Sequence, residues 1–269
     1  MAGLAVAGLI GAAPTAAGAT APLTPVGQWI VDYNEVGCFA SHKYQGGTDS
    51  ETLALKYSPG GHVVQALVVE PGNDSHQAEQ STGFIQIDGG KSVIKRFLVY
   101  GVKTATGSSK MRSTLLGDAE IAQLPAARSL TLAWSGERRE FTLANMAPLT
   151  KAMSECIADL REYWNMDEQS GATIRPTLVG KIGNYISSSD YPDIATHNLN
   201  EGTSEILLLV DESGKVRGCF NESTTGFAAL DGQACAAAER IRFTPPHDPA
   251  GKPMRSVFPL TIDWNTIFG

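Results

Sequence analysis

The chain of 269 residues is long enough for two domains. Hydrophobic residues make up 42% of it and charged residues 18%, which fits a soluble folded protein and excludes a disordered one. The net charge of -7, without any basic stretch, argues against a nucleic-acid partner, because phosphate binding needs clustered Lys and Arg.

Residues 1–21 consist almost entirely of Ala, Gly, Leu, Val and Ile. An apolar stretch at 4–10 precedes small residues at 17–19, which is the order of the hydrophobic region and the cleavage site in a secretory signal. The basic region that should open such a signal is missing, since the first basic residue is Lys43. A membrane anchor is the alternative, but it needs roughly 20 strongly apolar residues, and Pro14 interrupts the segment. We expect a signal-peptide remnant, export to the periplasm and a mature chain without a stable membrane span.

Short runs rich in β-branched and aromatic residues follow a linker at 22–27. They alternate with turn clusters such as 45–47 and 58–61, and the clusters at 88–90 and 135–137 are typical of hairpins. The runs lie at residues 29–33, 38–44, 52–57, 63–70, 84–87, 93–100, 110–116, 129–134 and 138–143. Strands at this regular spacing predict a mostly antiparallel β sandwich or a partly open barrel.

The β-rich part ends in a predicted helix at residues 147–164, whose apolar residues share one face at helical spacing. These residues are Leu149, Met153, Cys156, Ile157, Leu160 and Trp164. Because this face can pack on the sheet, we expect the helix to close an N-terminal domain at 28–165. The polar residues 166–188 are predicted to be a linker to a second domain.

The four cysteines, Cys38, Cys156, Cys219 and Cys235, contain no Cys-x-x-Cys pair, so their spacing does not indicate zinc or thiol redox chemistry. An even count behind a signal-like segment indicates two disulfides formed in an oxidising compartment. Three pairings are possible in principle. The segment boundaries favour one bond inside each half, Cys38 with Cys156 and Cys219 with Cys235.

The remaining residues predict a small domain with the element order α-β-β-α-β. A short helix is expected at 192–198, strands at 205–210 and 215–221, and a final strand at 255–264. Gly226 precedes a second helix, whose shared apolar face contains Leu230, Ala234, Ala238 and Ile241. This order buries both helices on one face of an antiparallel sheet, and the whole chain is predicted to be an α+β protein.

Several short motifs occur in a fixed order in this domain. They are Tyr191-Pro192 with Ala195, Glu201-Gly202, Asp211 to Val216, Ser223-Thr224-Thr225-Gly226 followed by Leu230-Asp231, Arg242-Phe243-Thr244-Pro245, and Gly251-Lys252-Pro253. In this order and spacing, residues 189–268 resemble the TonB C-terminal domain family. Two threonines stand where the family has serines, and Asn221 stands where an apolar residue is usual. Cys219 and Cys235 have the spacing of a disulfide-bearing version of the domain, whereas residues 1–165 resemble no family that we can name.

The sequence contains no recognisable pattern for catalysis or metal binding. Gly-x-Ser-x-Gly, Gly-x-Gly-x-x-Gly and P-loop patterns are absent. The histidines lack metal-ligand spacing and mostly lie beside predicted turns, so we expect them at the surface. They are His42, His62, His76, His197 and His247. We therefore predict no enzyme activity, no cofactor and no metal site.

The resemblance implies a partner-binding role. By this resemblance we expect an edge strand, to which an extended segment of an outer-membrane receptor pairs by β-augmentation, as in TonB-like domains. The candidate edge in this chain consists of Arg255, Ser256, Val257, Phe258, Pro259 and Leu260. The alternative is a covered edge that Pro259 blunts.

We expect from this a periplasmic, non-enzymatic binding or adaptor protein, with an envelope protein or an outer-membrane receptor segment as its partner. Two alternatives remain. One is an energy transducer variant for transmembrane transport with a truncated N-terminal anchor, although the chain has no Pro-rich spacer. The other is hydrolase activity in the N-terminal domain, which no motif supports.

Overall fold

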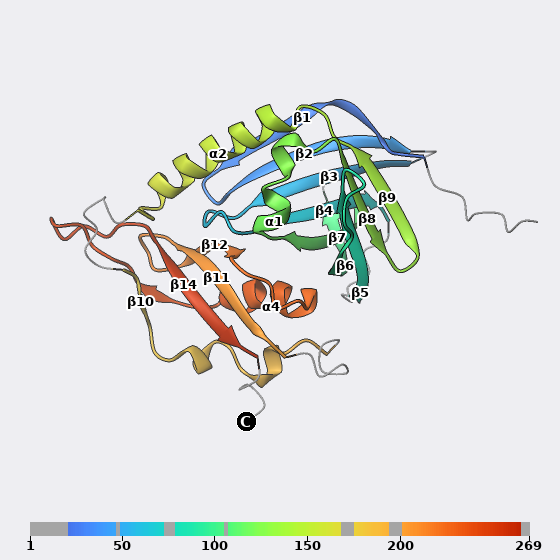
Figure 1. Cartoon of the computed structure of the whole chain (residues 1–269). Coiled ribbons are helices and arrows are strands. Elements are labelled where there is room, and N and C mark those ends of the chain that lie inside the picture. Colours follow the sequence, from blue (N-terminus) through green and yellow to red (C-terminus); the bar gives the residue numbers. More distant parts are fainter. Residues whose placement is uncertain are drawn as a thin grey trace, which may run out of the picture.

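The computed structural model describes residues 21–46, 49–72, 79–104, 107–167, 175–193 and 201–264. It is an α+β structure, with a large curled antiparallel sheet in the N-terminal half and a smaller α/β region in the C-terminal half (Figure 1). The segment at 1–20 and most of the expected helix at 192–198 lie outside the described residues. None of the helices in the described ranges has the length and apolar character needed to cross a membrane.

The N-terminal sheet contains nine strands in the order β1-β2-β3-β4-β7-β6-β5-β8-β9. Each predicted run corresponds to one of them, but β1 and β5 each begin five residues earlier than predicted. Most of the expected linker at 22–27 is therefore part of β1. The strands are β1 (Thr24–Asn34), β2 (Gly37–Gly46), β3 (Asp49–Tyr57), β4 (Val64–Pro71), β5 (Glu79–Ile87), β6 (Val93–Thr104), β7 (Gly107–Leu116), β8 (Ser129–Trp134) and β9 (Glu137–Thr142). Alternate residues along these strands point inward, and their apolar side chains form the core.

The first and last strands of this sheet meet. The backbone N–H of Leu23 donates to the carbonyl of Glu140, and the carbonyl of Leu23 accepts from the N–H of Thr142 at 3.1 Å. This short parallel bridge draws the edges of β1 and β9 together, so the sheet is a partly open barrel and not a sandwich. The sequence left these two architectures open.

Two glycines in this sheet occupy positions where another residue would be strained. Gly136 and Ser135 both have positive φ, 81° and 45°, and form the two-residue turn between β8 and β9. Gly83 lies on β5 where the neighbouring strand β8 approaches closely, because a Cβ atom at Gly83 would meet the carbonyl oxygen of Ala133 at 1.8 Å. No side chain fits at this position without separation of the two strands.

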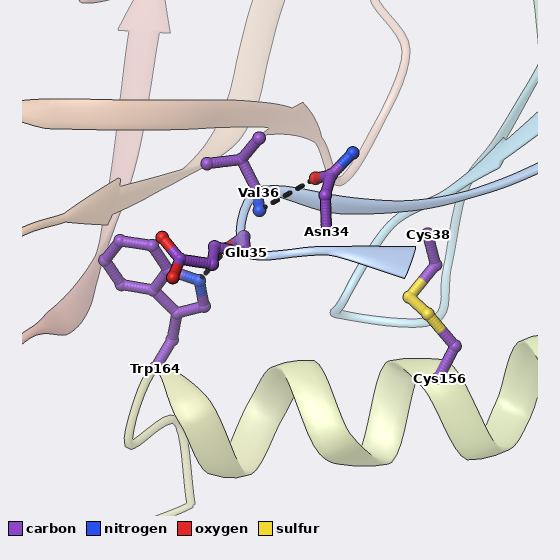
Figure 2. Close-up of a disulfide and its surroundings, with 6 residues drawn as sticks. All are labelled: Asn34, Glu35, Val36, Cys38, Cys156 and Trp164. Carbon is purple, nitrogen blue, oxygen red and sulfur yellow. Dashed lines mark hydrogen bonds between the residues drawn. A yellow bond between two sulfur atoms is a disulfide. The ribbon is translucent and has the colours of Figure 1, made fainter. Parts of the chain in front are cut away.

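Helix α2 (Met146–Tyr163) packs its apolar face against β1, β2 and the short helix η1 (Leu124–Ala126). The disulfide between Cys38 and Cys156 joins this helix to β2 (Figure 2). At the end of the helix, the indole Nε1 of Trp164 donates to the carbonyl of Glu35 in the β1–β2 turn at 2.6 Å. The predicted helix and its disulfide bond to the first hairpin are therefore present. Together they fix the position of this hairpin.

The C-terminal region contains a three-stranded antiparallel sheet in the order β12-β11-β14. Its strands are β12 (Val216–Asn221), β11 (Thr203–Val210) and β14 (Ser256–Asp263), and helix α4 (Ala228–Ala238) packs on one face of the sheet. The predicted apolar face of this helix, with Leu230, Ala234, Ala238 and Ile241, is fully buried. The disulfide between Cys219 and Cys235 ties β12 to α4.

Part of the segment predicted as a linker has regular structure. Strand β10 (Thr177–Leu178) pairs with β13 (Phe243–Thr244), and the short helices η3 (Ile182–Asn184) and η4 (Ser188–Asp190) follow it. The sequence does not predict these elements, because two-residue strands and single helical turns are too short to show a period.

The small sheet contributes to two hydrophobic cores, one on each face. Ile206, Leu208 and Val210 of β11 point to α4, whereas Leu207 and Leu209 point the other way and belong to the core of the barrel. Phe220 and Val257 from the flanking strands join them there. The two halves thus share an apolar contact, through the side chains of β11 that face the barrel.

Candidate functional site

Strand β14 contains most of the predicted partner-binding edge and forms one edge of the small sheet (Figure 1). It pairs with β11 from Ser256 opposite Val210 to Asp263 opposite Thr203. No strand in the described ranges pairs with its other side. The predicted window at 255–260 therefore lies on a sheet edge, although Arg255 precedes the strand and the strand continues beyond the window.

The direction of the backbone groups along β14 follows from one hydrogen bond, because bonded and non-bonded pairs alternate in an antiparallel ladder. The N–H of Trp264 donates to the carbonyl of Gly202 at 3.0 Å. The even-numbered residues of 256–264 therefore turn their backbone groups toward β11, and the odd-numbered residues of 257–263 turn theirs outward. Pro259 falls on an outward position, so its missing N–H removes no bond to β11.

The side chains of β14 differ along its length. Val257 is buried in the barrel core, but Pro259 and Thr261, on the same face, are exposed. On the other face, Phe258 and Leu260 are half-buried against the core of α4. The outward-facing, accessible part of the strand is therefore its second half, and the beginning of the predicted window is covered.

Arg255 fixes the beginning of β14 against the N-terminal half. Its guanidinium lies 3.8 Å from the ring centroid of Tyr163 on α2, and its Nη2 is 2.7 Å from Oε1 of Glu212. The carbonyl of Arg255 also accepts a hydrogen bond from Nδ2 of Asn165 at 2.9 Å. These contacts fix the position of Arg255 at the beginning of the strand.

The opposite edge of the sheet, on β12, is covered by the barrel. Nζ of Lys56 on β3 donates a hydrogen bond to the carbonyl of Cys219 at 3.2 Å. This carbonyl points outward from the edge of β12, so the bond satisfies one of the edge's backbone groups. Next to it, the carboxylate of Glu222 accepts hydrogen bonds from the hydroxyl of Ser58 and, at 3.3 Å, from the N–H of Gly60. Burial raises the pKa of Glu222, and these hydrogen bonds offset part of the rise. The barrel thus leaves β14 as the accessible edge.

The same region carries a buried carboxylate at the start of α4. Oδ2 of Asp231 accepts a hydrogen bond from the hydroxyl of Thr224 at 2.6 Å, and its Oδ1 accepts one from the N–H of Thr225 at 2.8 Å. Burial raises the pKa of Asp231, and the hydrogen bonds from Thr224 and Thr225 offset part of this rise. Hydrogen bonds between the Thr-Thr-Gly and Leu-Asp motifs therefore fix the loop before α4 against the beginning of this helix.

Comparison with known families agrees with this arrangement. Residues 187–266 match the family described as Gram-negative bacterial TonB protein C-terminal. The resemblance found in the sequence is confirmed for this segment, and the N-terminal region has no recognised family. No curated protein and no solved structure matched the chain. Within the TonB C-terminal match, β11, β12, β14 and α4 are the elements that build the edge described above.

One expectation about the histidines is wrong. His42 lies within β2 with its side chain 3% exposed, between the rings of Trp29 and Tyr44. Its position on the inward face of a strand decides its burial, and the nearby turn does not. Within the described part of the chain, no group of three or more His, Cys, Asp or Glu residues is placed to hold a metal ion.

Proposed function

We propose that this protein is a periplasmic, non-enzymatic binding or adaptor protein, whose TonB C-terminal segment pairs along β14 with an extended segment of an outer-membrane or other envelope protein. The observation that carries the proposal is the asymmetry of the small sheet. Lys56 and Glu222 join the β12 edge to the barrel, whereas no strand in the described ranges pairs with the outer side of β14.

The family match supports the class of partner. TonB-like proteins of Gram-negative bacteria are associated with the cell envelope, and their C-terminal domains interact with outer-membrane proteins. Pairing along an edge strand gains main-chain hydrogen bonds with little dependence on side chains, which suits an extended segment. On β14 the outward N–H groups of Val257 and Thr261 flank Pro259, which has no N–H. A partner strand would therefore accept hydrogen bonds on both sides of Pro259 and none from Pro259 itself.

The barrel would hold this edge strand in a fixed position. Arg255 contacts Tyr163 on α2, and Val257 packs into the barrel core, so the first residues of β14 are held before a partner arrives. A fixed strand loses less conformational entropy on binding than a mobile one. This arrangement supports an adaptor that presents one preformed edge.

Replacing Thr261 with Pro tests the proposal. This change removes an outward N–H without loss of a bond to β11, and Pro259 shows that the strand accepts Pro at an outward position. Val257 is a poorer target, because its side chain is buried. The matched control is Thr261→Val, which keeps the N–H and the approximate shape.

The probe is an array of peptides of about 12 residues from the periplasmic segments of outer-membrane receptors, a length that spans the eight residues of β14. We expect Thr261→Pro to weaken the best peptide about tenfold, from the lost hydrogen bond and the clash of the ring with the added strand, with Thr261→Val near wild type. Circular dichroism must first show that both variants are folded. Unchanged binding by folded Thr261→Pro, or no binding by the wild type, would overturn the proposal.

A further inference from the structure

A cavity of about 380 Å³ lies between the barrel and the C-terminal segment. Its barrel side is formed by residues of β3, β4, β6 and β7, and its other side by β12 and the first turns of α4. The disulfide between Cys219 and Cys235 forms part of the wall and holds β12 and α4 at a fixed separation. The volume lies within the range of small-molecule sites, roughly 300–1,000 Å³.

The cavity contains a lysine without a carboxylate partner. Lys56 lines the wall, and it forms no ion pair with any residue in the described ranges. Its Nζ lies 4.4 Å from the ring centroid of Phe220 and donates one hydrogen bond, to the carbonyl of Cys219. An ammonium group has three N–H donors, so two remain for a ligand. Burial lowers the pKa of Lys56.

Two other polar groups in the wall, on Asn221 and Asp231, are not open to a ligand. Oδ1 of Asn221 has no hydrogen-bond partner among the described residues, but it is covered by protein atoms, so a ligand in the cavity does not reach it. The one carboxylate in the wall, Asp231, is already bonded to Thr224 and Thr225 and does not compete for Lys56.

The rest of the wall is largely apolar. Leu98, Leu115 and Phe220 face the cavity together with Ala228 and Ala229 at the start of α4. A ligand that fits this wall has an anionic head for Lys56 and an apolar body.

We propose that this cavity binds a small amphipathic carboxylate, with its carboxylate on Lys56 and its hydrocarbon chain against the apolar wall. The ligand contacts both halves of the protein, so it stabilises their junction by mass action. The site lies away from β14, and the proposal does not depend on partner binding at that edge.

The probes are decanoate and decan-1-ol, titrated by calorimetry against the full chain. We expect decanoate to bind more tightly than decan-1-ol. Lys56→Met should weaken decanoate about tenfold or more, since a hydrogen bond to a charged group is worth about 1.5–3 kcal/mol, and leave decan-1-ol unchanged. Lys151→Met, on the solvent side of α2, is the matched control, because the Lys151 side chain is 79% exposed.

A second variant keeps the proposal open to refutation if Lys56→Met does not fold. Ala228→Trp should fill the cavity and abolish all binding while Lys56 remains. The proposal is overturned if neither probe binds, if decan-1-ol binds as tightly as decanoate, or if folded Ala228→Trp binds like the wild type.

Discussion

The two disulfides close loops of very different length, and this difference predicts which of them matters more for stability. Cys38 and Cys156 are separated by 118 positions, and Cys219 and Cys235 by 16. In the chain-entropy model these loops contribute about 4.9 and about 3.1 kcal/mol, because the longer loop removes more freedom from the unfolded chain. Cys38 and Cys156 are also fully buried in the barrel core, so their removal disturbs packing as well. Both effects have the same direction.

The test compares two double variants, Cys38→Ala with Cys156→Ala and Cys219→Ala with Cys235→Ala, by urea unfolding of oxidised protein. We expect the first pair to lower the free energy of unfolding by about 1.8 kcal/mol more than the second. The wild type with both disulfides reduced should lose about as much as the two variants together. If the Cys219–Cys235 variant is the less stable one, the loop-length reasoning is wrong.

Two other changes test the packing described above. Because burial raises the pKa of Glu222, its neutral form favours folding, and this contribution is lost as the pH rises from about 4.5 through the folded-state pKa. Glu222→Gln should therefore gain stability relative to wild type in urea unfolding as the pH rises above about 4.5; a constant difference contradicts the shift. Gly83→Ala, whose Cβ would meet the Ala133 carbonyl oxygen at 1.8 Å, should lower stability by about 2–3 kcal/mol. Gly136→Ala, at positive φ with no atom within 4 Å, should cost about 1 kcal/mol, and equal losses would refute the strand-contact argument.

The strands and α2 could be predicted because each depends on a local period. Residues 129–134 alternate between turn clusters and become β8 without any shift, and the stripe through Met153 and Cys156 becomes the buried face of α2. The order of the strands could not be predicted in the same way. The pairing of β4 with β7 and of β5 with β8 brings together segments separated by other strands, and no local pattern encodes such a neighbour.

The edge was located from the sequence, but its accessible part was not. Which backbone groups of β14 point outward depends on the register with β11, fixed by Trp264 and Gly202. The covered state of β12 depends on Lys56, which is separated from Cys219 by 163 positions. In the sequence Lys56 is one polar residue in an alternating strand and carries no signal of this role. The cavity was missed for the same reason.

The bridge between Leu23 and Phe141 has a consequence for the rate of folding. It closes the barrel with a contact between residues at the two ends of the N-terminal half, and contacts between distant parts of a chain form slowly because the intervening loop must first be ordered. The bond between Cys38 and Cys156 spans nearly the same interval. Once oxidised, it holds the first hairpin near α2 and shortens the search for closure. We therefore expect oxidised chains to form the bridge between Leu23 and Phe141 faster than reduced chains.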